Sequence, residues 1–449
     1  MAGESPDRPA AGRGVALVAL GCRVNRADLD ALAASLPPGF ELAGEGERAE
    51  YVVVNTCTIT ADADAAARQA IRRAARDHPG ARIVAAGCYA ELCPEAISSL
   101  PGVEAVVGVR AQGAVPAVLA RLEAGMQGAE AVEAAVRSAP AWGPAPGDPA
   151  RHTRPFLKVQ DGCDARCAYC VVPLARGRSR SLPFEDAVDR LLALGARHAE
   201  VVLTGVHLGA YGKDLEPRRS LAELVRTALA RGLAARLRLS SIEPLEFPME
   251  LVLDAVTVRP LCEHFHLPVQ SGSPRILEAM RRPCRLDRYR RVVQDLAVLV
   301  PGACIGTDLM VGFPGETESD HRATVALVEA LPLAYLHVFP FSPRRGTPAA
   351  AMRPAVPREV QRARVRELLA LSERRWRAFL AAQAGRELEV VVERIVDGIA
   401  RGTARRYATV RWPAVHERRG ELARVRVVAS DGAECFGVRA EAFASRLPP

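Results

Sequence analysis

The sequence predicts an α/β protein in three parts: an N-terminal parallel α/β domain, a central partial (β/α) barrel, and a small antiparallel β-barrel at the C-terminus. Up to residue 384, short apolar runs alternate with helical patterns, which is typical of parallel sheets. From residue 385 the runs are rich in valine or alternate in polarity, and glycines separate them, as in a small antiparallel barrel. The length of 449 residues agrees with about three domains, at roughly 150 residues per domain.

The first domain is expected at residues 14–125. Its strands are predicted at Val15–Leu20, Tyr51–Val54 and Arg82–Ala86, which are short apolar runs, and helical patterns such as Asp28–Leu36 and Asp62–Asp77 lie between them. Residues 126–152, centred on Ala139–Pro144, are rich in Ala, Gly and Pro. That composition predicts a linker.

The second domain is expected at residues 153–384. Helical patterns such as Pro183–Leu194 and Leu286–Leu299 separate its apolar runs, and a basic amphipathic helix closes it at about 357–384. In parallel barrels the chemistry lies at the C-terminal ends of the strands. Six strands are predicted: Phe156–Val159, Glu200–Leu203, Arg236–Leu239, His264–Leu267, Ala303–Asp308 and Leu333–Phe339.

The third domain, residues 385–449, is predicted to form the small barrel from runs such as Leu388–Glu393, Tyr407–Arg411 and Leu422–Val428. It holds twelve arginines against nine acidic residues. That excess fits either RNA binding or an ordinary solvated surface.

The composition predicts a cytoplasmic protein that is not embedded in a membrane. No run of 18 or more apolar residues is present, and residues 1–14 lack the basic-then-apolar pattern of a signal peptide. The net charge of +8 comes almost entirely from arginine, because Lys158 and Lys213 are the only lysines. This charge is a mild indication of a polyanionic partner, although a GC-rich genome also favours arginine.

Cys163, Cys167 and Cys170 form the most informative pattern, C-x3-C-x2-C. A structural zinc site prefers four ligands in two pairs, so zinc would need a distant fourth residue here. A disulfide framework is disfavoured, because the eleven cysteines are sparse and odd in number. Three thiolates suit a [4Fe-4S] cluster whose open iron can hold S-adenosylmethionine, which indicates radical chemistry.

Cys22, Cys57 and Cys88 each lie at or just after the end of a predicted strand in the first domain. Strand ends of one parallel sheet converge, so the three thiols are expected to meet and hold a second cluster. Taken singly, each would be a buried apolar cysteine. Cys93 is a possible substitute for Cys88, and the others, Cys262, Cys284, Cys304 and Cys435, share no pattern.

Nine short motifs resemble those of the radical S-adenosylmethionine methylthiotransferase family over nearly the whole chain. The resemblance implies an N-terminal domain with three cluster cysteines, a central radical domain and a C-terminal TRAM barrel, of which the barrel matches most weakly. The motifs are Leu20-Gly21-Cys22-Arg23-Val24-Asn25, Asn55-Thr56-Cys57-Thr58, Ala86-Gly87-Cys88-Tyr89, Lys158-Val159-Gln160-Asp161-Gly162-Cys163, Ala175-Arg176-Gly177, Leu203-Thr204-Gly205, Ser240-Ser241-Ile242-Glu243-Pro244, Leu267-Pro268-Val269-Gln270-Ser271-Gly272-Ser273 and Val311-Gly312-Phe313-Pro314-Gly315-Glu316-Thr317.

Three branches of this family act on isopentenyladenosine in tRNA, on threonylcarbamoyladenosine in tRNA, or on an aspartate of a small-subunit ribosomal protein. Gly21–Asn25, Asn55–Thr60 and His337–Ser342 resemble the threonylcarbamoyladenosine branch. The resemblance implies conversion of N6-threonylcarbamoyladenosine at position 37 of tRNA to its 2-methylthio derivative. The steps are hydrogen abstraction from C2, sulfur insertion and methyl transfer.

The implied cofactors are two [4Fe-4S] clusters and S-adenosylmethionine. The implied partners are the tRNA anticodon stem-loop, a reductase or a flavodoxin- or ferredoxin-type electron donor, and a sulfur donor system. A different class remains open, namely a non-catalytic iron–sulfur protein that only binds RNA.

Cofactor contacts are expected beside the radical cluster, and no catalytic residue is expected beyond the cluster cysteines. Tyr169 resembles the family's aromatic near the cofactor adenine, although it could also pack the loop. Gly205 would let the backbone approach the methionine end. Glu243 and Gln270, at predicted strand ends, would bind the amino group or the ribose of S-adenosylmethionine. Asp308 would do the same or cap the next helix.

Phosphate contacts are expected from two groups of arginines, for which a solvated charged face is the alternative. His207, His264, His266 and His337 are expected to be structural or to support the site, because six cysteines already account for the clusters. The two arginine groups are Arg68, Arg72 and Arg73 in the first domain, and Arg176, Arg178 and Arg180 after the radical loop.

Overall fold

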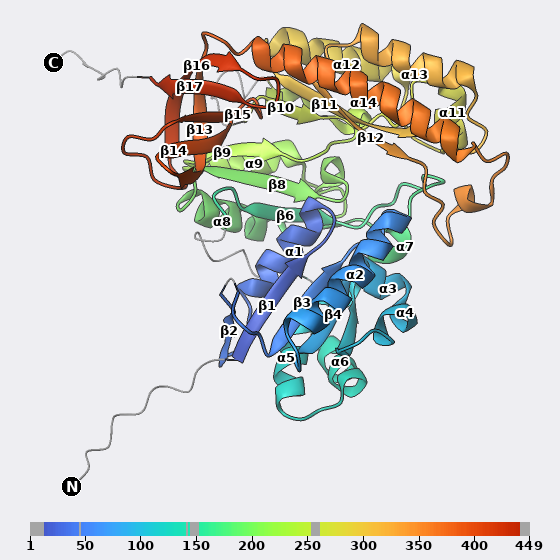
Figure 1. Ribbon diagram of the computed structural model, residues 1–449, viewed down its shortest axis with the longest axis vertical. Helices are drawn as coiled ribbons and strands as arrows, with labels where there is room; N and C mark the ends of the chain where they lie inside the picture. The colour runs from blue at the N-terminus through green and yellow to red at the C-terminus, as the bar shows by residue number, and fades with distance from the viewer. Residues whose placement is uncertain (1–12, 45, 141, 144–151, 253–260, 441–449) are drawn as a thin grey trace. The chain divides into compact units, whose positions relative to one another are not determined.

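The computed structural model describes residues 13–44, 46–140, 142–143, 152–252 and 261–440 (Figure 1). Residues 141 and 144–151 of the predicted linker, residues 253–260 of the predicted second domain and the last nine residues of the predicted third domain lie outside these ranges. The chain divides into two compact units. The N-terminal unit comprises the residues up to Gly147 together with Val171–Gly177, and the C-terminal unit comprises Asp148–Cys170 and the residues from Arg178 onward.

A five-stranded parallel sheet forms the centre of the N-terminal unit. The strand order is β2-β1-β3-β4-β5, so the direction of sheet growth reverses between β1 and β3. Such a reversal is a topological switch point, where doubly wound sheets bind their ligands beyond the carboxyl ends of the strands. The strands are β1 (Arg13–Ala19), β2 (Phe40–Leu42), β3 (Tyr51–Thr56), β4 (Arg82–Gly87) and β5 (Val103–Gly108).

Helices cover both faces of this sheet, because neighbouring strand residues point to opposite sides. Val53 and Val84 pack in one apolar cluster with residues of α1, α5 and α6. Val54 and Ile83 pack in the other, with residues of α2, α3 and α4. The helices are α1 (Arg23–Ala33), α2 (Ala61–Asp77), α3 (Cys88–Leu92), α4 (Pro94–Ser98), α5 (Val115–Glu123), α6 (Gly128–Val136) and α7 (Val172–Arg176).

Helix α6 corrects the prediction of a linker over residues 126–152. Ala131 and Ala135 are fully buried in the core of the N-terminal unit. Their spacing of four residues places both on one side of the helix. Small side chains there let the helix pack against the sheet, so an alanine-rich composition marks a core element in this segment.

The central part of the C-terminal unit contains the six predicted parallel strands, which form two sheets joined by a bridge between Leu237 and Leu261. One sheet has the order β7-β6-β8-β9 and the other has β10-β11-β12. The first sheet contains β6 (Phe156–Asp161), β7 (Arg180–Ser181), β8 (Glu200–Gly205) and β9 (Arg236–Leu239); the second contains β10 (His264–His266), β11 (Cys304–Val311) and β12 (Tyr335–Pro340).

Helices alternate with these strands, and several begin at side-chain caps. Ser220 and Glu223 form a capping box on α9, and Thr317 and Asp320 form one on α13. The helices are α8 (Phe184–Gly195), α9 (Leu221–Ala230), α11 (Pro274–Ala279), α12 (Leu286–Leu299), α13 (Glu318–Ala330) and α14 (Arg358–Ala381).

The C-terminal strands close into a five-stranded barrel around Trp412. The predicted small barrel is therefore present, with one parallel pair, β15–β17, among antiparallel ones. Its strands are β13 (Glu387–Val396), β14 (Ile399–Ala404), β15 (Thr409–Pro413), β16 (Leu422–Ser430) and β17 (Cys435–Arg439).

Buried arginines of β9 attach this barrel to the rest of the C-terminal unit. Arg236 and Arg238 both pair with the fully buried Glu200 at 2.7 Å. Their remaining donors reach barrel carbonyl groups, including Thr403 O and Ala404 O at 3.0 Å. Arg236 also pairs with Glu389 at 3.1 Å, so each buried guanidinium has an acidic partner and hydrogen bonds, as burial requires.

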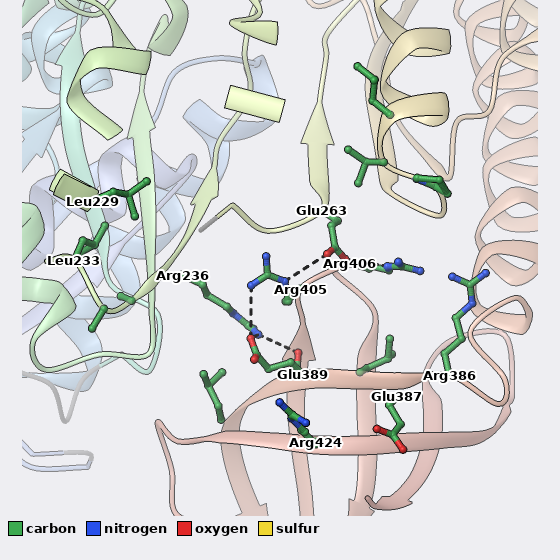
Figure 2. A pocket seen from close by; sticks show the side chains of 17 residues that line it. Leu229, Leu233, Arg236, Glu263, Arg386, Glu387, Glu389, Arg405, Arg406 and Arg424 are labelled. Carbon is green, nitrogen blue, oxygen red and sulfur yellow. Dashed lines mark hydrogen bonds and ion pairs between the residues drawn. The ribbon is translucent and has the colours of Figure 1, made fainter. Parts of the chain in front are cut away.

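A cavity of about 980 Å³ lies beside this junction (Figure 2). Three of the arginines that line it pair with acidic neighbours: Arg405 and Arg406 pair with Glu263, and Arg236 pairs with Glu389. Its lining includes none of the six predicted cluster cysteines.

Among the described residues, no helix is both long enough and apolar enough to cross a membrane.

Candidate functional site

Cys22, Cys57 and Cys88 lie at the carboxyl ends of three adjacent parallel strands. Cys22 follows β1 and precedes α1, Cys57 follows β3, and Cys88 begins α3 after β4. Cys22 and Cys57 therefore flank the switch point between β1 and β3. The three thiols lie close together, because Cys22 raises the pKa of both Cys57 and Cys88, and Cys57 raises that of Cys88.

The backbone around these cysteines leaves room only for glycine at two positions. Gly21 and Gly87 precede Cys22 and Cys88 with φ of +82° and +103°, in the left-handed region that other residues avoid. A Cβ at Gly21 would lie 2.5 Å from the Cys57 Sγ atom. Glycine at position 21 therefore lets the backbone just before Cys22 lie close to Cys57. This close approach fits a site at which three thiolates bind one cluster.

Asn25 joins the strand ends at this site. Its buried side-chain amide donates to Leu20 O at 3.0 Å and to Thr56 O at 2.9 Å. The Asn25 Oδ1 atom faces the Cys88 Sγ atom at 4.0 Å. Sequence reasoning noticed Asn25 only within a motif, although a fully buried amide is a strong positioning element.

Burial raises the pKa of the Cys57 thiol and raises that of Cys88 to about 11. The charge of Arg176 opposes both increases. This arginine was predicted to contact phosphate, but its side chain is only 3% exposed and pairs with Asp28 at 2.9 Å. The prediction is corrected, because a buried guanidinium cannot reach an RNA backbone.

Cys163, Cys167 and Cys170 lie together in the loop that follows β6. Ala168 anchors this loop on both sides: its N–H donates to Met280 O at 2.7 Å, and its carbonyl accepts from Ala349 N at 2.8 Å. Gln160 fixes the entry to the loop, because its side chain donates to Gly162 O at 2.8 Å. The loop is therefore held in shape by groups other than its cysteines.

Two side chains flank the thiols of this loop. His207 places Nδ1 3.5 Å from the Cys163 Sγ atom and Nε2 2.6 Å from the Glu246 carboxylate. Burial alone would lower the pKa of His207, but these two contacts raise it to about 10, and the His207 contact lowers the pKa of Glu246 to about 2. His207 thus links the Cys163 thiol to the Glu246 carboxylate.

Arg282 is the second of these side chains, and no sequence pattern indicates it. Its side chain is 5% exposed and reaches both oxygens of Glu243, at 2.8 and 2.9 Å. Burial raises the pKa of Cys167, and the Arg282 charge opposes that increase. Glu243, a predicted cofactor contact, is therefore held by a cation beside a cluster cysteine.

Gln270 has the features of a ligand-binding residue. Its backbone has φ of +76°, and its N–H and C=O groups bridge Asp308 and Met310 of β11. Its side chain is buried, and the Oε1 atom has no hydrogen-bond partner among the residues that the structure describes. A buried unpaired oxygen is costly unless a ligand satisfies it, so the site fits a bound cofactor with a donor group.

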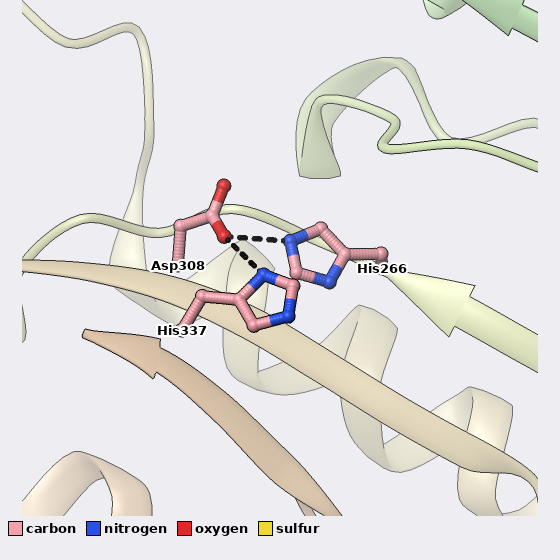
Figure 3. Close-up of side chains that lie close together, drawn as sticks. All are labelled: His266, Asp308 and His337. Atoms are coloured by element: carbon pink, nitrogen blue, oxygen red, sulfur yellow. Dashed lines mark hydrogen bonds and ion pairs between the residues drawn. The ribbon is translucent and has the colours of Figure 1, made fainter. Parts of the chain in front are cut away.

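Asp308 lies in the middle of β11 and accepts from two histidines, so it does not cap a helix (Figure 3). His266 Nε2 lies 2.8 Å and His337 Nδ1 lies 3.2 Å from the same Asp308 oxygen. Burial alone would raise the pKa of Asp308, but these contacts hold it well below its usual range. The short nitrogen–oxygen distances are those of hydrogen bonds, which orient both rings.

The remaining predicted residues are held by close packing. Tyr169 packs against the apolar cluster of Ala168 and Phe313, and a Cβ at Gly205 would lie 2.9 Å from Gln160. His264 is buried and contacts the Tyr335 hydroxyl at 2.9 Å, as expected of a structural histidine. Cys93 packs in the apolar cluster of α2 and α4, apart from that of Cys88.

The other predicted phosphate contacts differ in their partners. Arg68 donates to the Tyr89 hydroxyl at 2.7 Å, and Arg180 lies 3.3 Å from Asp161. Arg73 pairs with Asp77 on the surface, and Arg178 is 93% exposed. Arg72 is exposed and has no ion pair among the described residues.

Two family matches span most of the chain. Residues 14–108 match the family described as "Uncharacterized protein family UPF0004", and residues 157–328 match the radical SAM superfamily. The threonylcarbamoyladenosine tRNA methylthiotransferase MtaB of Aquifex aeolicus is 36% identical over 387 residues, covering 84% of this chain and 92% of that relative. The chain belongs to the radical SAM methylthiotransferase family.

Other methylthiotransferase relatives carry two different names. The MtaB of Thermotoga maritima is 32% identical and covers 97% of this chain and 99% of its own. The tRNA-2-methylthio-N(6)-dimethylallyladenosine synthase of Thermobifida fusca is 33% identical and covers 83% of this chain and 76% of its own. The radical SAM methyltransferase TsrM from Kitasatospora setae shares the fold, with a TM-score of 0.53, 18% identity and coverage of 76% and 77%.

The radical SAM fold of this methylthiotransferase implies a [4Fe-4S] cluster and S-adenosylmethionine. The three cysteines of the loop after β6 and the Gln270 oxygen, which has no partner among the described residues, fit that pair of cofactors. The sheets and the closed barrel confirm the expected fold class, and the similar relatives confirm the expected family.

Proposed function

We propose that this enzyme converts N6-threonylcarbamoyladenosine at position 37 of tRNA to its 2-methylthio derivative. The observation that carries the proposal is the similarity to MtaB proteins at 32–36% identity over most of the chain. Relatives named for dimethylallyladenosine are 33–34% identical over 83–87% of it, so isopentenyladenosine is the main alternative substrate. The ribosomal protein aspartate remains the other.

Cys163, Cys167 and Cys170 would hold the cluster that, with S-adenosylmethionine, supplies a 5′-deoxyadenosyl radical able to remove hydrogen from C2 of adenine. No side-chain acid or base can ionise that C–H bond. The titratable side chains near the three cysteines would therefore position the cofactor and would not remove the proton. Gln270 offers its free oxygen to a cofactor donor. Glu243, fixed by Arg282, presents a carboxylate for an amino or hydroxyl group.

Cys22, Cys57 and Cys88 would hold a second [4Fe-4S] cluster, which supplies the inserted sulfur. Their convergence at the switch point supports this proposal. A second S-adenosylmethionine would supply the methyl group. The proposed partners are the tRNA anticodon stem-loop, a reductase or a flavodoxin- or ferredoxin-type electron donor, and a sulfur donor system, all in the cytoplasm.

The substrate is tested by nucleoside mass spectrometry of tRNA from a deletion strain. Loss of 2-methylthio-N6-threonylcarbamoyladenosine, restored by the gene, is expected. Persistence of that nucleoside with loss of the isopentenyl analogue would assign the chain to the alternative substrate. A control strain that carries the Cys163→Ala variant should match the deletion.

The reaction class is tested with anaerobically reconstituted protein, dithionite and S-adenosylmethionine. Formation of 5′-deoxyadenosine is expected, and none should form after Cys167→Ala. A protein that binds tRNA but makes no 5′-deoxyadenosine would be a non-catalytic iron–sulfur RNA-binding protein.

A further inference from the structure

Arg176 is a buried cation to which the proposed reaction assigns no role. It belongs to α7, which follows the radical-cluster loop in the chain but folds with the N-terminal unit. Its Nη2 atom donates to Asn25 Oδ1 at 2.6 Å and to Asp28 Oδ2 at 2.9 Å. Asp28 is itself only 6% exposed. A charge pair this deeply buried is costly to form and does not by itself stabilise a fold.

The position of Arg176 relates it to the cysteines of the N-terminal unit. Ala175, its neighbour, packs in one small apolar cluster with Cys88 and Val109. Asn25 Oδ1, which accepts from Arg176, also faces the Cys88 Sγ atom at 4.0 Å. The positive charge acts on both Cys57 and Cys88.

Hydrogen bonds from Arg110, a residue outside α7, hold the helix that carries Arg176. Arg110 donates from Nε to Ala175 O at 3.1 Å and from Nη2 to Leu174 O at 2.5 Å. A carboxylate, an amide and a packed helix thus hold the guanidinium in one place. A mobile surface arginine could not keep a constant distance to a buried thiol.

We propose that Arg176 is a positioning residue for the second cluster, whose buried charge compensates the thiolates of Cys57 and Cys88 and raises the cluster's reduction potential. A cluster bound by three thiolates carries net negative charge, and one more electron increases it. Nearby positive charge and hydrogen bonds to sulfur favour the reduced state, and burial strengthens both effects. This inference rests on the proposed presence of the second cluster.

The test uses full-length protein in which Cys163, Cys167 and Cys170 are replaced by alanine, so that only the second cluster forms. Its midpoint potential is measured by redox titration followed by electron paramagnetic resonance. Arg176→Gln should shift the midpoint to a more negative value, and Asp28→Asn should shift it to a more positive value. Arg137→Gln is the matched control, because Arg137 is 72% exposed in the same unit and should leave the midpoint unchanged.

Shifts of opposite sign support an electrostatic role, because a purely structural pair would respond alike to loss of either partner. Unchanged midpoints in both variants would overturn the role of Arg176. If Arg176→Gln loses iron, Arg176→Lys keeps the charge, and it should retain the cluster with a smaller shift. A background protein that binds no iron would instead overturn the second cluster, which separates the two failures.

Discussion

At the scale of single residues, Gly21 and Gly39 share a left-handed backbone but differ in their neighbours. Their φ angles are +82° and +83°. A Cβ at Gly21 would lie 2.5 Å from Cys57 Sγ, whereas a Cβ at Gly39 would have nothing within 4 Å. Alanine substitutions at the two glycines therefore distinguish the effect of backbone strain from the effect of a steric clash with Cys57.

We expect Gly21→Ala to prevent assembly of the second cluster, because the new methyl group displaces Cys57. Iron should fall from about eight to about four per chain, and 5′-deoxyadenosine formation should persist. Gly39→Ala should have a similar backbone cost, about 1–2 kcal/mol, and retain all its iron. Iron analysis of both reconstituted variants is the measurement, and full iron content in Gly21→Ala would contradict the assignment.

We expect Arg282→Met to destabilise the apoprotein by about 3 kcal/mol, because it leaves the Glu243 carboxylate without its buried partner. Chemical denaturation measures this change. Arg285→Met is the control, since Arg285 is 76% exposed and its pair with Asp287 is solvated. Equal midpoints for the two variants would show that the Arg282–Glu243 pair is dispensable.

The cysteines could be predicted from sequence because their spacing and their place after strands are local signals. Arg282 could not, because its partners Glu243 and Pro268 are 39 and 14 residues away. Arg176 was misinterpreted for a related reason. Clustered arginines resemble a phosphate-binding surface, and only the fold shows that this one is buried.

At the scale of elements, most predicted strands are present because continuous apolar runs suit strands buried on both faces. Strand β14 was missed, since Ile399–Ala404 contains an arginine and a glycine. That glycine is required by packing: a Cβ at Gly402 would lie 1.9 Å from Val391 O. Sequence patterns do not show such close approach between strands.

The loop after β15 supports a prediction about pH. The Glu417 side chain, 2% exposed, accepts from Trp412 Nε1 at 3.0 Å and lies 2.8 Å from Arg439. Burial alone would raise its pKa, but the hydrogen bond from Trp412 and the backbone donors lower it to about 2 from an ordinary 4.5. The carboxylate therefore stabilises the fold above pH 4.5, and this contribution is lost as pH falls towards 2.

We expect Glu417→Gln to cost about 1–3 kcal/mol of unfolding free energy at pH 7. The difference from the native protein should narrow as pH falls from 4.5 towards 2. Denaturation of the apoprotein, followed by tryptophan fluorescence, measures both effects. A difference that does not change with pH would mean that the carboxylate charge is not responsible.

At the scale of the whole molecule, the net charge of +8 can attract tRNA only through arginines that are exposed and not paired with acidic residues. Arg72 is exposed on α2 without an ion pair among the described residues, whereas both Nη atoms of Arg231 pair with acids. We expect Arg72→Gln to lower the slope of log affinity for tRNA against log salt concentration by about 1. Arg231→Gln should leave the slope unchanged, and equal slopes for both variants would indicate that α2 presents only a solvated face.

The fold class could be predicted at this scale because strand–helix alternation and the glycine-separated C-terminal strands extend over long stretches. The division into units could not. Helix α7 belongs to the N-terminal unit although the residues on either side of it belong to the other. That assignment depends on contacts such as Arg176 with Asp28, which join residues 148 positions apart.

This interleaving affects how the protein can be divided or recombined. A fragment that ends before residue 150 contains the sheet and the three cysteines proposed to hold the second cluster, but it lacks α7 and the cation beside Cys88. The two halves are therefore not interchangeable modules, and a gene fusion at the obvious boundary would exchange the thiols without their counter-charge. We expect natural and engineered recombinants of this fold to retain both parts from one parent.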